Sequence, residues 1–252
     1  MTPQLQDRLR ASGAHLLSSI CLAAVSAAVV FWLWYPAPLA EASGVRDIFV
    51  LLLLVDISLG PLITLFVFNK KKPELKRDLI IVAVIQLAAL LYGLHAVFIA
   101  RPAFIVMASD RFDLVFANDL DDNKLSEAKL PQFTRLPVLG PEYAGAPMPD
   151  DAKERSDLTL SSVAGGDDLQ HVPKYYQPYA AVKTSVIQLA RPLDKLRAFN
   201  KTRGVVIDQL QVKHQASNPG FLPMRGKVKD LTVIVNRTTG DVLEVVELQH
   251  WP

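Results

Sequence analysis

The residues that could do chemistry in this 252-residue chain are polar side chains within long apolar stretches. Asp56 is the single charged residue of these stretches and is followed closely by Pro61, while Gln86 and Tyr92 lie in a later stretch. A carboxyl group at membrane depth costs about 2.5–3.5 kcal/mol, so it needs a polar partner or water. Proline removes a backbone donor and frees a carbonyl one turn earlier. We expect Asp56, Pro61, Gln86 and Tyr92 to make polar contacts, internal or with a partner, inside the membrane.

Three roles are open for Asp56. The favoured one is a packing contact that fixes a helix bundle; the second is a contact with another membrane protein. Proton or ion transport is the third, although one carboxyl group in three helices makes a poor pathway. At about 1.5 Å of rise per residue, Ser26 and Tyr92 lie at a similar depth to Asp56. A hydroxyl group from either residue, or the ring of His95 about one turn nearer the outside, is expected to satisfy the carboxyl group.

The elements that position these residues are three apolar segments, at about 16–34, 48–68 and 79–100. Each is long enough to cross a bilayer as a helix, which predicts an integral membrane protein with an N-terminal membrane domain over residues 1–100. The main alternative for the first segment is a signal peptide cleaved after residues 40–42. Signal peptides have an apolar core of only about 7–15 residues, so we expect a permanent span.

Basic residues predict how the spans are oriented. Seven lie beside the spans on one side and three on the other; the seven are Arg8, Arg10, Lys70, Lys71, Lys72, Lys76 and Arg77. Because basic residues collect on the cytoplasmic side, we expect a cytoplasmic N-terminus. Everything after Arg101 then lies outside the cytoplasm, in the periplasm if the cell is Gram-negative. The predicted location is therefore the bacterial inner membrane.

Residues 101–252 predict a small extracytoplasmic α+β domain, with 19 basic and 19 acidic residues. Strands are expected at 104–107 and 112–116, and a closing hairpin at 230–236 and 241–248 with Gly240 in its turn. Helices are expected at about 122–130, 150–165, 179–190 and 192–199. The proline-rich stretch 131–149 predicts irregular structure.

The chain shows none of the common catalytic or cofactor-binding motifs. It lacks a G-x-S-x-G elbow, an H-E-x-x-H pair, a phosphate-binding glycine loop and a dinucleotide fingerprint. One cysteine, Cys21, cannot build a multi-cysteine metal site, and the formal net charge of +2 argues against nucleic acid as a partner. We therefore expect no enzyme activity, no cofactor, no metal and no catalytic residues.

Several short motifs occur in an order that resembles one family, the type IV pilin accessory proteins of the TfpX/TfpZ family. They are WYPAPL at 34–39, LLVD at 53–56, LGPL at 59–62, QLAALLYG at 86–93, RPA at 101–103, DRFDLV at 110–115 and GKVKDLTV at 226–233, with Trp251 near the end. Each motif alone is common, and their shared order and spacing carry the resemblance. Residues 131–170 carry no such motif.

The resemblance implies an inner-membrane accessory protein that assists assembly, surface display or extension–retraction balance of a cognate type IV major pilin. Its expected partners are that pilin, other inner-membrane components of pilus assembly and the lipid bilayer. Two alternatives belong to other functional classes: a membrane-anchored enzyme that modifies the pilin, and a periplasmic ligand sensor with a separate signalling partner. The sensor would need that partner because little of the chain is expected in the cytoplasm.

Overall fold

The computed structural model describes residues 2–251, which form two compact units. The first unit comprises the chain up to Pro36 together with Val45–Ala100. The second comprises Ala37–Gly44 together with the chain from Arg101 onward. A short segment between two apolar helices therefore belongs with residues that follow much later in the sequence.

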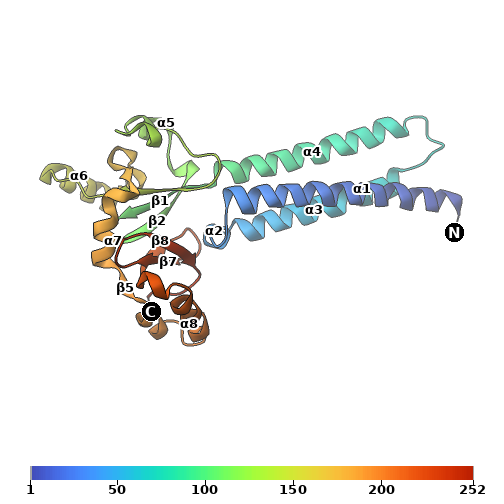
Figure 1. The fold of residues 1–252 in the computed structure, drawn as a ribbon. Helices are drawn as coiled ribbons and strands as arrows, with labels where there is room; N and C mark the ends of the chain where they lie inside the picture. The colour runs from blue at the N-terminus through green and yellow to red at the C-terminus, as the bar shows by residue number, and fades with distance from the viewer. Residues whose placement is uncertain (1, 252) are drawn as a thin grey trace. The chain divides into compact units, whose positions relative to one another are not determined.

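Three long helices make up the first unit, and each is long and apolar enough to cross a membrane. They are α1 (Pro3–Ala28), which continues through the π-helical segment η1 (Val29–Trp34), α3 (Val45–Val67) and α4 (Leu75–Ile99). Both α1 and α4 pack against α3 (Figure 1). The prediction of three apolar helices is confirmed, although the first helix begins well before residue 16.

The second unit is built on a mixed eight-stranded sheet in the order β4-β3-β1-β2-β6-β7-β8, with β5 paired to β6. The β1/β3 and β2/β6 pairs are parallel and the remaining pairs are antiparallel. The strands are β1 (Pro102–Ala108), β2 (Arg111–Phe116), β3 (Glu142–Ala146), β4 (Gln177–Pro178), β5 (Arg191–Pro192), β6 (Pro219–Arg225), β7 (Leu231–Asn236) and β8 (Val242–Val246).

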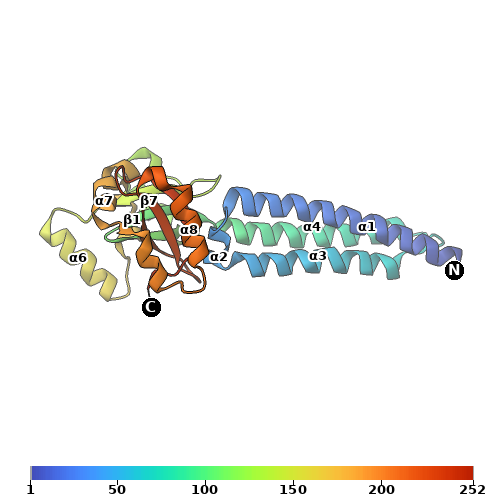
Figure 2. The same ribbon diagram turned by 60° about the horizontal axis from the view of Figure 1, so that its bottom comes forward.

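Helices cover both faces of this sheet, as Figure 2 shows from a second direction. On one face the core contains Ile105, Phe112 and Leu222, with α7 packed against it. The other face carries two clusters, one under α5 and several 3₁₀ turns and one under α8. The helices are α2 (Leu39–Ser43), α5 (Asp122–Ser126), α6 (Ala152–Val163), α7 (Lys183–Leu189) and α8 (Gly204–Lys213). Three helices and a mixed sheet confirm the predicted fold class.

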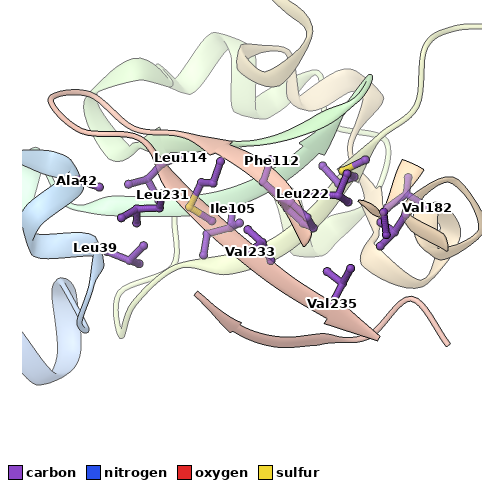
Figure 3. Packing of buried hydrophobic residues seen from close by; sticks show 14 of the residues in the cluster. Leu39, Ala42, Ile105, Phe112, Leu114, Val182, Leu222, Leu231, Val233 and Val235 are labelled. Carbon is purple, nitrogen blue, oxygen red and sulfur yellow. The ribbon is translucent and has the colours of Figure 1, made fainter. Parts of the chain in front are cut away.

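The segment 37–44 is part of the core of the second unit. Leu39 and Ala42 of α2 are buried in the same cluster as Leu231, as Figure 3 shows. The carbonyl oxygen of Ala42 accepts hydrogen bonds from the backbone nitrogens of Lys227 and Val228, at 3.1 and 2.9 Å. These bonds hold a short loop that composition alone would treat as a simple connection between two helices.

Predicted and observed elements agree best where local signals are strong. Strands β1 and β2 and the final hairpin are confirmed, with Gly240 at φ +74°. The helix expected at 122–130 ends at Ser126, and Pro192, expected to begin a helix, instead precedes a 3₁₀ turn. The stretch 131–149 contains β3, which we had expected to be irregular. Sequence reasoning missed α8 and β6 entirely.

Candidate functional site

Asp56 and Gln86 lie together on facing helices of the first unit. The Gln86 Nε2 atom donates a hydrogen bond to the backbone carbonyl of Asp56, at 2.8 Å. Asp56 Oδ2 and Gln86 Oε1 are both buried and have no hydrogen-bond partner among the described residues. Two acceptors therefore face the interior of the bundle without a donor, and an unpaired polar atom in an apolar surrounding is costly.

A small cavity opens where these two residues meet α1. Its volume is about 150 Å³. Asp56 comes from α3 and Gln86 from α4, while α1 contributes His15, Ser18 and Ser19. The space is large enough for several water molecules and its wall offers both donors and acceptors, which are the two conditions for water to occupy it.

Gly60 and Pro61 permit the close approach of α3 to its neighbours. A Cβ atom at Gly60 would lie 2.2 Å from the Gln86 side chain, so only glycine leaves room for the observed contact. The Ser12 hydroxyl donates to the Pro61 carbonyl at 2.9 Å. The sequence predicts a neighbouring donor for a carbonyl about one turn before the proline, and Gln86 donates to the carbonyl of Asp56 in that region.

A second polar pairing joins α1 and α3 and was not anticipated from the sequence. His15 Nδ1 lies 2.6 Å from the hydroxyl of buried Thr64, and Arg8 Nε donates to the Phe68 carbonyl at 2.8 Å. Their signal in the sequence is a row of polar residues on one side of residues 8–19. Such hydrogen bonds between helices replace the hydrophobic driving force that is missing inside a bilayer.

Tyr92 points away from the other two helices. Its side chain is 77% exposed, so it does not supply the hydroxyl that we expected beside the Asp56 carboxyl group. His95, one turn further along α4, is also exposed, whereas Ser26 is buried in the bundle. The four predicted residues therefore separate into an internal group, Asp56, Pro61 and Gln86, and an outward-facing Tyr92.

Within residues 2–251, no group of three or more His, Cys, Asp or Glu side chains could hold a metal ion. The polar groups of the first unit can form hydrogen bonds with one another or with a partner.

The comparison with known proteins places these features in a family. Residues 3–44 match the family described as "Fimbrial assembly protein FimB". A relative from Dichelobacter nodosus, "Fimbrial assembly protein, serogroup I", is 30% identical over 218 residues, which cover 84% of this chain and 84% of the relative. The chain belongs to the fimbrial assembly protein family.

Two further members of the family from the same organism are similar to it. "Fimbrial assembly protein, serogroup E1" is 29% identical over 192 residues, covering 75% of this chain and 73% of the relative. "Fimbrial assembly protein, serogroups C1 and C2" is 33% identical over 119 residues, covering 46% of this chain and 91% of the relative. No solved structure matches.

The family match at 3–44 has clear structural bounds. It begins at the first residue of α1, Pro3, and ends at Gly44, the residue after α2. It therefore covers one apolar helix and the whole of the segment that packs into the core of the second unit. In this fimbrial assembly protein, the matched stretch is the part of the sequence that contributes to both units.

Proposed function

We propose that this chain is a non-enzymatic accessory protein of type IV pilus assembly, of the TfpX/TfpZ kind, that acts on a cognate major pilin. The names of its relatives, all fimbrial assembly proteins, support the general role. The three apolar helices support a place in the membrane. A pilin awaiting assembly has an apolar N-terminal helix in the membrane and a globular head outside, so a partner with two units of matching kind can contact both parts.

The proposed topology places the N-terminus in the cytoplasm and the second unit in the periplasm. Basic residues flanking the helices favour this arrangement, since Arg8, Arg10 and the loop between α3 and α4 lie at the same end of the bundle. Segment 37–44 and the chain after Arg101 then emerge on the same outer side, which their membership of one compact unit requires.

The observation that carries the proposal is the outward-facing polar surface of α4. Tyr92 and His95 are exposed there, with the small residues Ala88, Ala89 and Ala96 beside them, also exposed. Small residues let two helices approach closely in a membrane, and polar residues bind across the contact. A polar side chain facing lipid is unfavourable, so this face of α4 calls for a second helix. We assign it to the apolar helix of the pilin.

Crosslinking tests this assignment. A photo-crosslinking residue at position 92 should capture the pilin in cells that make it. The same residue at position 97 serves as a matched control, because Val97 is on the same helix but buried against the bundle. Capture of the pilin at both positions, or lipid alone at position 92, would contradict the proposed docking face.

Deletion tests the role itself. Deletion of the gene for this chain should lower the number of surface pili per cell, counted by electron microscopy. The count is repeated in cells that cannot retract pili: recovery there assigns the role to extension–retraction balance, and persistent loss assigns it to assembly. Normal numbers of pili in both backgrounds would contradict an accessory function.

The mass of the pilin separates an accessory protein from a modifying enzyme. We expect intact pilin to have the same mass in the presence and absence of this chain, measured by mass spectrometry of whole protein. An added mass on the pilin that is present with this chain and lost on its deletion would instead establish the modifying enzyme.

A further inference from the structure

A second polar cavity lies in the second unit, beside the end of the β2/β6 ladder. Strand β6 pairs with β2 only at Phe112↔Met224 and Asp113↔Arg225. Strand β6 ends at Arg225 while β2 continues to Phe116, and a cavity of about 510 Å³ opens beside this point. Asp113 and Arg225 both line it, and the turn before Asp168 closes another side.

Asp113 is the buried member of this cavity. Only 3% of the residue is exposed, although it carries a carboxylate. Its Oδ1 atom accepts one hydrogen bond from Arg111 Nε at 3.2 Å. Its Oδ2 atom is buried and has no hydrogen-bond partner among the described residues. A carboxylate has about four lone-pair positions, so Asp113 can accept a further donor while keeping Arg111.

The other acidic groups of the cavity are already engaged in local structure. Asp119 accepts from the Phe116 backbone nitrogen at 2.9 Å. Asp168 accepts from the Leu169 backbone nitrogen at 3.0 Å and from Gln170 Nε2 at 3.2 Å. Asp113 is therefore the acid of this cavity that has a buried oxygen without a donor.

Two basic residues lie on the other side of the cavity, Arg225 at the end of β6 and Lys227 in the turn that follows it. Arg225 and Lys227 are exposed and line the cavity, and neither forms an ion pair with any residue in the described range 2–251. The Lys227 Nζ atom lies 5.4 Å from the centre of the Phe116 ring. The cavity thus offers a buried acceptor, Asp113, together with two exposed cations that form no salt bridge within the described residues.

We propose that this cavity, which we call the Asp113 cavity, receives the globular head of the pilin. A lysine or arginine side chain of the head donates to Asp113, and a neighbouring carboxylate of the head pairs with Arg225 and Lys227. A polar, open cavity with separated charges suits a pair of opposite charges on a protein surface better than an apolar metabolite. This inference rests on the proposed function and adds to it the site and the chemistry of recognition.

The electrostatics of the cavity are consistent with a cationic ligand. Burial raises the pKa of Asp113 to about 6, against the opposing effects of the Arg111 and Arg225 guanidinium groups. A cation placed at the carboxylate would favour its charged form and relieve this cost.

The cavity also adjoins the bonds to α2, because Lys227 lines it and donates its backbone N–H to Ala42.

The test uses the full chain in membranes that contain the cognate pilin. A photo-crosslinking residue at Ser162, which lines the cavity, should capture the pilin head through a peptide containing lysine or arginine. Asp113→Asn keeps the size of the side chain and removes its charge, and should lower capture roughly tenfold, the loss expected for one charged hydrogen-bond partner. Arg225→Glu, at an exposed position, should also lower it.

Asp110→Asn is the matched control. Asp110 also lies beside Arg111, at 3.9 Å, but its side chain is 71% exposed and it does not line the cavity. It should leave capture unchanged, and thermal midpoints of all variants verify folding. Equal capture by wild type, Asp113→Asn and Arg225→Glu would overturn the proposal, as would capture of a different protein.

A crosslinker at position 92 in the same cells separates a failure of the Asp113 cavity from a failure of the proposed function. Capture of the pilin at position 92 but not at position 162 rejects the Asp113 cavity and leaves the proposed function in place. Failure at both positions rejects the proposed function as well.

Discussion

The carbonyl oxygen of Ala42 lies 2.9 Å from the backbone nitrogen of Val228. This bond ties the loop between α1 and α3 to the turn between β6 and β7, far away in the sequence. Segment 37–44 is continuous with a long apolar helix at each end, and Ala100–Arg101 makes a third connection. Three crossings of the chain therefore join the two units.

The turn that binds α2 tolerates no side chain at Gly226. A Cβ atom there would lie 2.1 Å from the Lys229 carbonyl oxygen and 3.1 Å from Ala42 Cβ. Gly226→Ala should destabilise the second unit by about 1–3 kcal/mol through overpacking. The thermal midpoint in detergent measures this. Gly204→Ala is the control, since its Cβ would meet nothing closer than 3.7 Å; equal midpoints for the two variants would refute the close contact.

The contact between α3 and α4 predicts coupling between two substitutions. Gly60→Ala places a Cβ atom 2.2 Å from the Gln86 side chain and should displace it from the Asp56 carbonyl. In a Gln86→Ala background the same substitution should cost less, because the obstructing side chain is gone. A double-mutant cycle on thermal midpoints measures the coupling. Additive effects would show that Gln86 does not occupy this position.

Replacing the Asp56 side chain separates structure from function. Gln86 binds the backbone carbonyl of Asp56, so Asp56→Leu leaves that acceptor in place. It also removes an acid that costs about 2.5–3.5 kcal/mol within the membrane. We expect unchanged or higher amounts of protein on immunoblots together with fewer surface pili. Fewer pili accompanied by loss of the protein would instead indicate a packing role for the carboxyl group.

The buried Asp113 gives the second unit a distinct pH dependence. Its folded-state pKa of about 6 is raised above the ordinary 3.8, because burial disfavours the charge. The contribution of protonated Asp113 to the free energy of unfolding is fully present below pH 3.8 and is lost as pH rises through about 6. The shift corresponds to about 3 kcal/mol. Relative to Asp113→Asn, the wild-type thermal midpoint should fall between pH 4 and 6.5; a constant difference would contradict the shift.

His250 gives the stability of the second unit the opposite pH dependence. It is 1% exposed, its Nδ1 atom lies 3.2 Å from the Thr232 hydroxyl, and burial lowers its pKa from 6.5. The unfolded chain binds a proton at this residue more readily than the folded chain does. Stability is therefore present above pH 6.5 and lost as pH falls below it. His250→Gln should abolish this component of acid unfolding, and an unchanged pH profile of the variant would count against it.

Elements with a strong local signal can be predicted from the residues alone. Three apolar stretches indicate three long helices because a bilayer demands about 20 apolar residues per span. Two runs rich in β-branched residues on either side of Gly240 likewise indicate a hairpin. The glycine fits its turn, because a tight turn needs a residue with positive φ. Polar residues in apolar surroundings, Asp56 and Gln86, stood out for the same reason: each is costly wherever the chain places it.

Which of those residues meet depends on long-range packing. Helix rise alone predicts a similar depth for Tyr92, Ser26 and Asp56. Tyr92 nevertheless faces outward, because rise along a helix carries no information on rotation about its axis. Strand β6, with prolines that argue against a strand, forms because β7 pairs along its whole length. Segment 37–44 reads as a linker, yet burial of Leu39 against residues about 190 positions later makes it core. The Asp113 cavity depends on the same kind of long-range pairing, which no local pattern encodes.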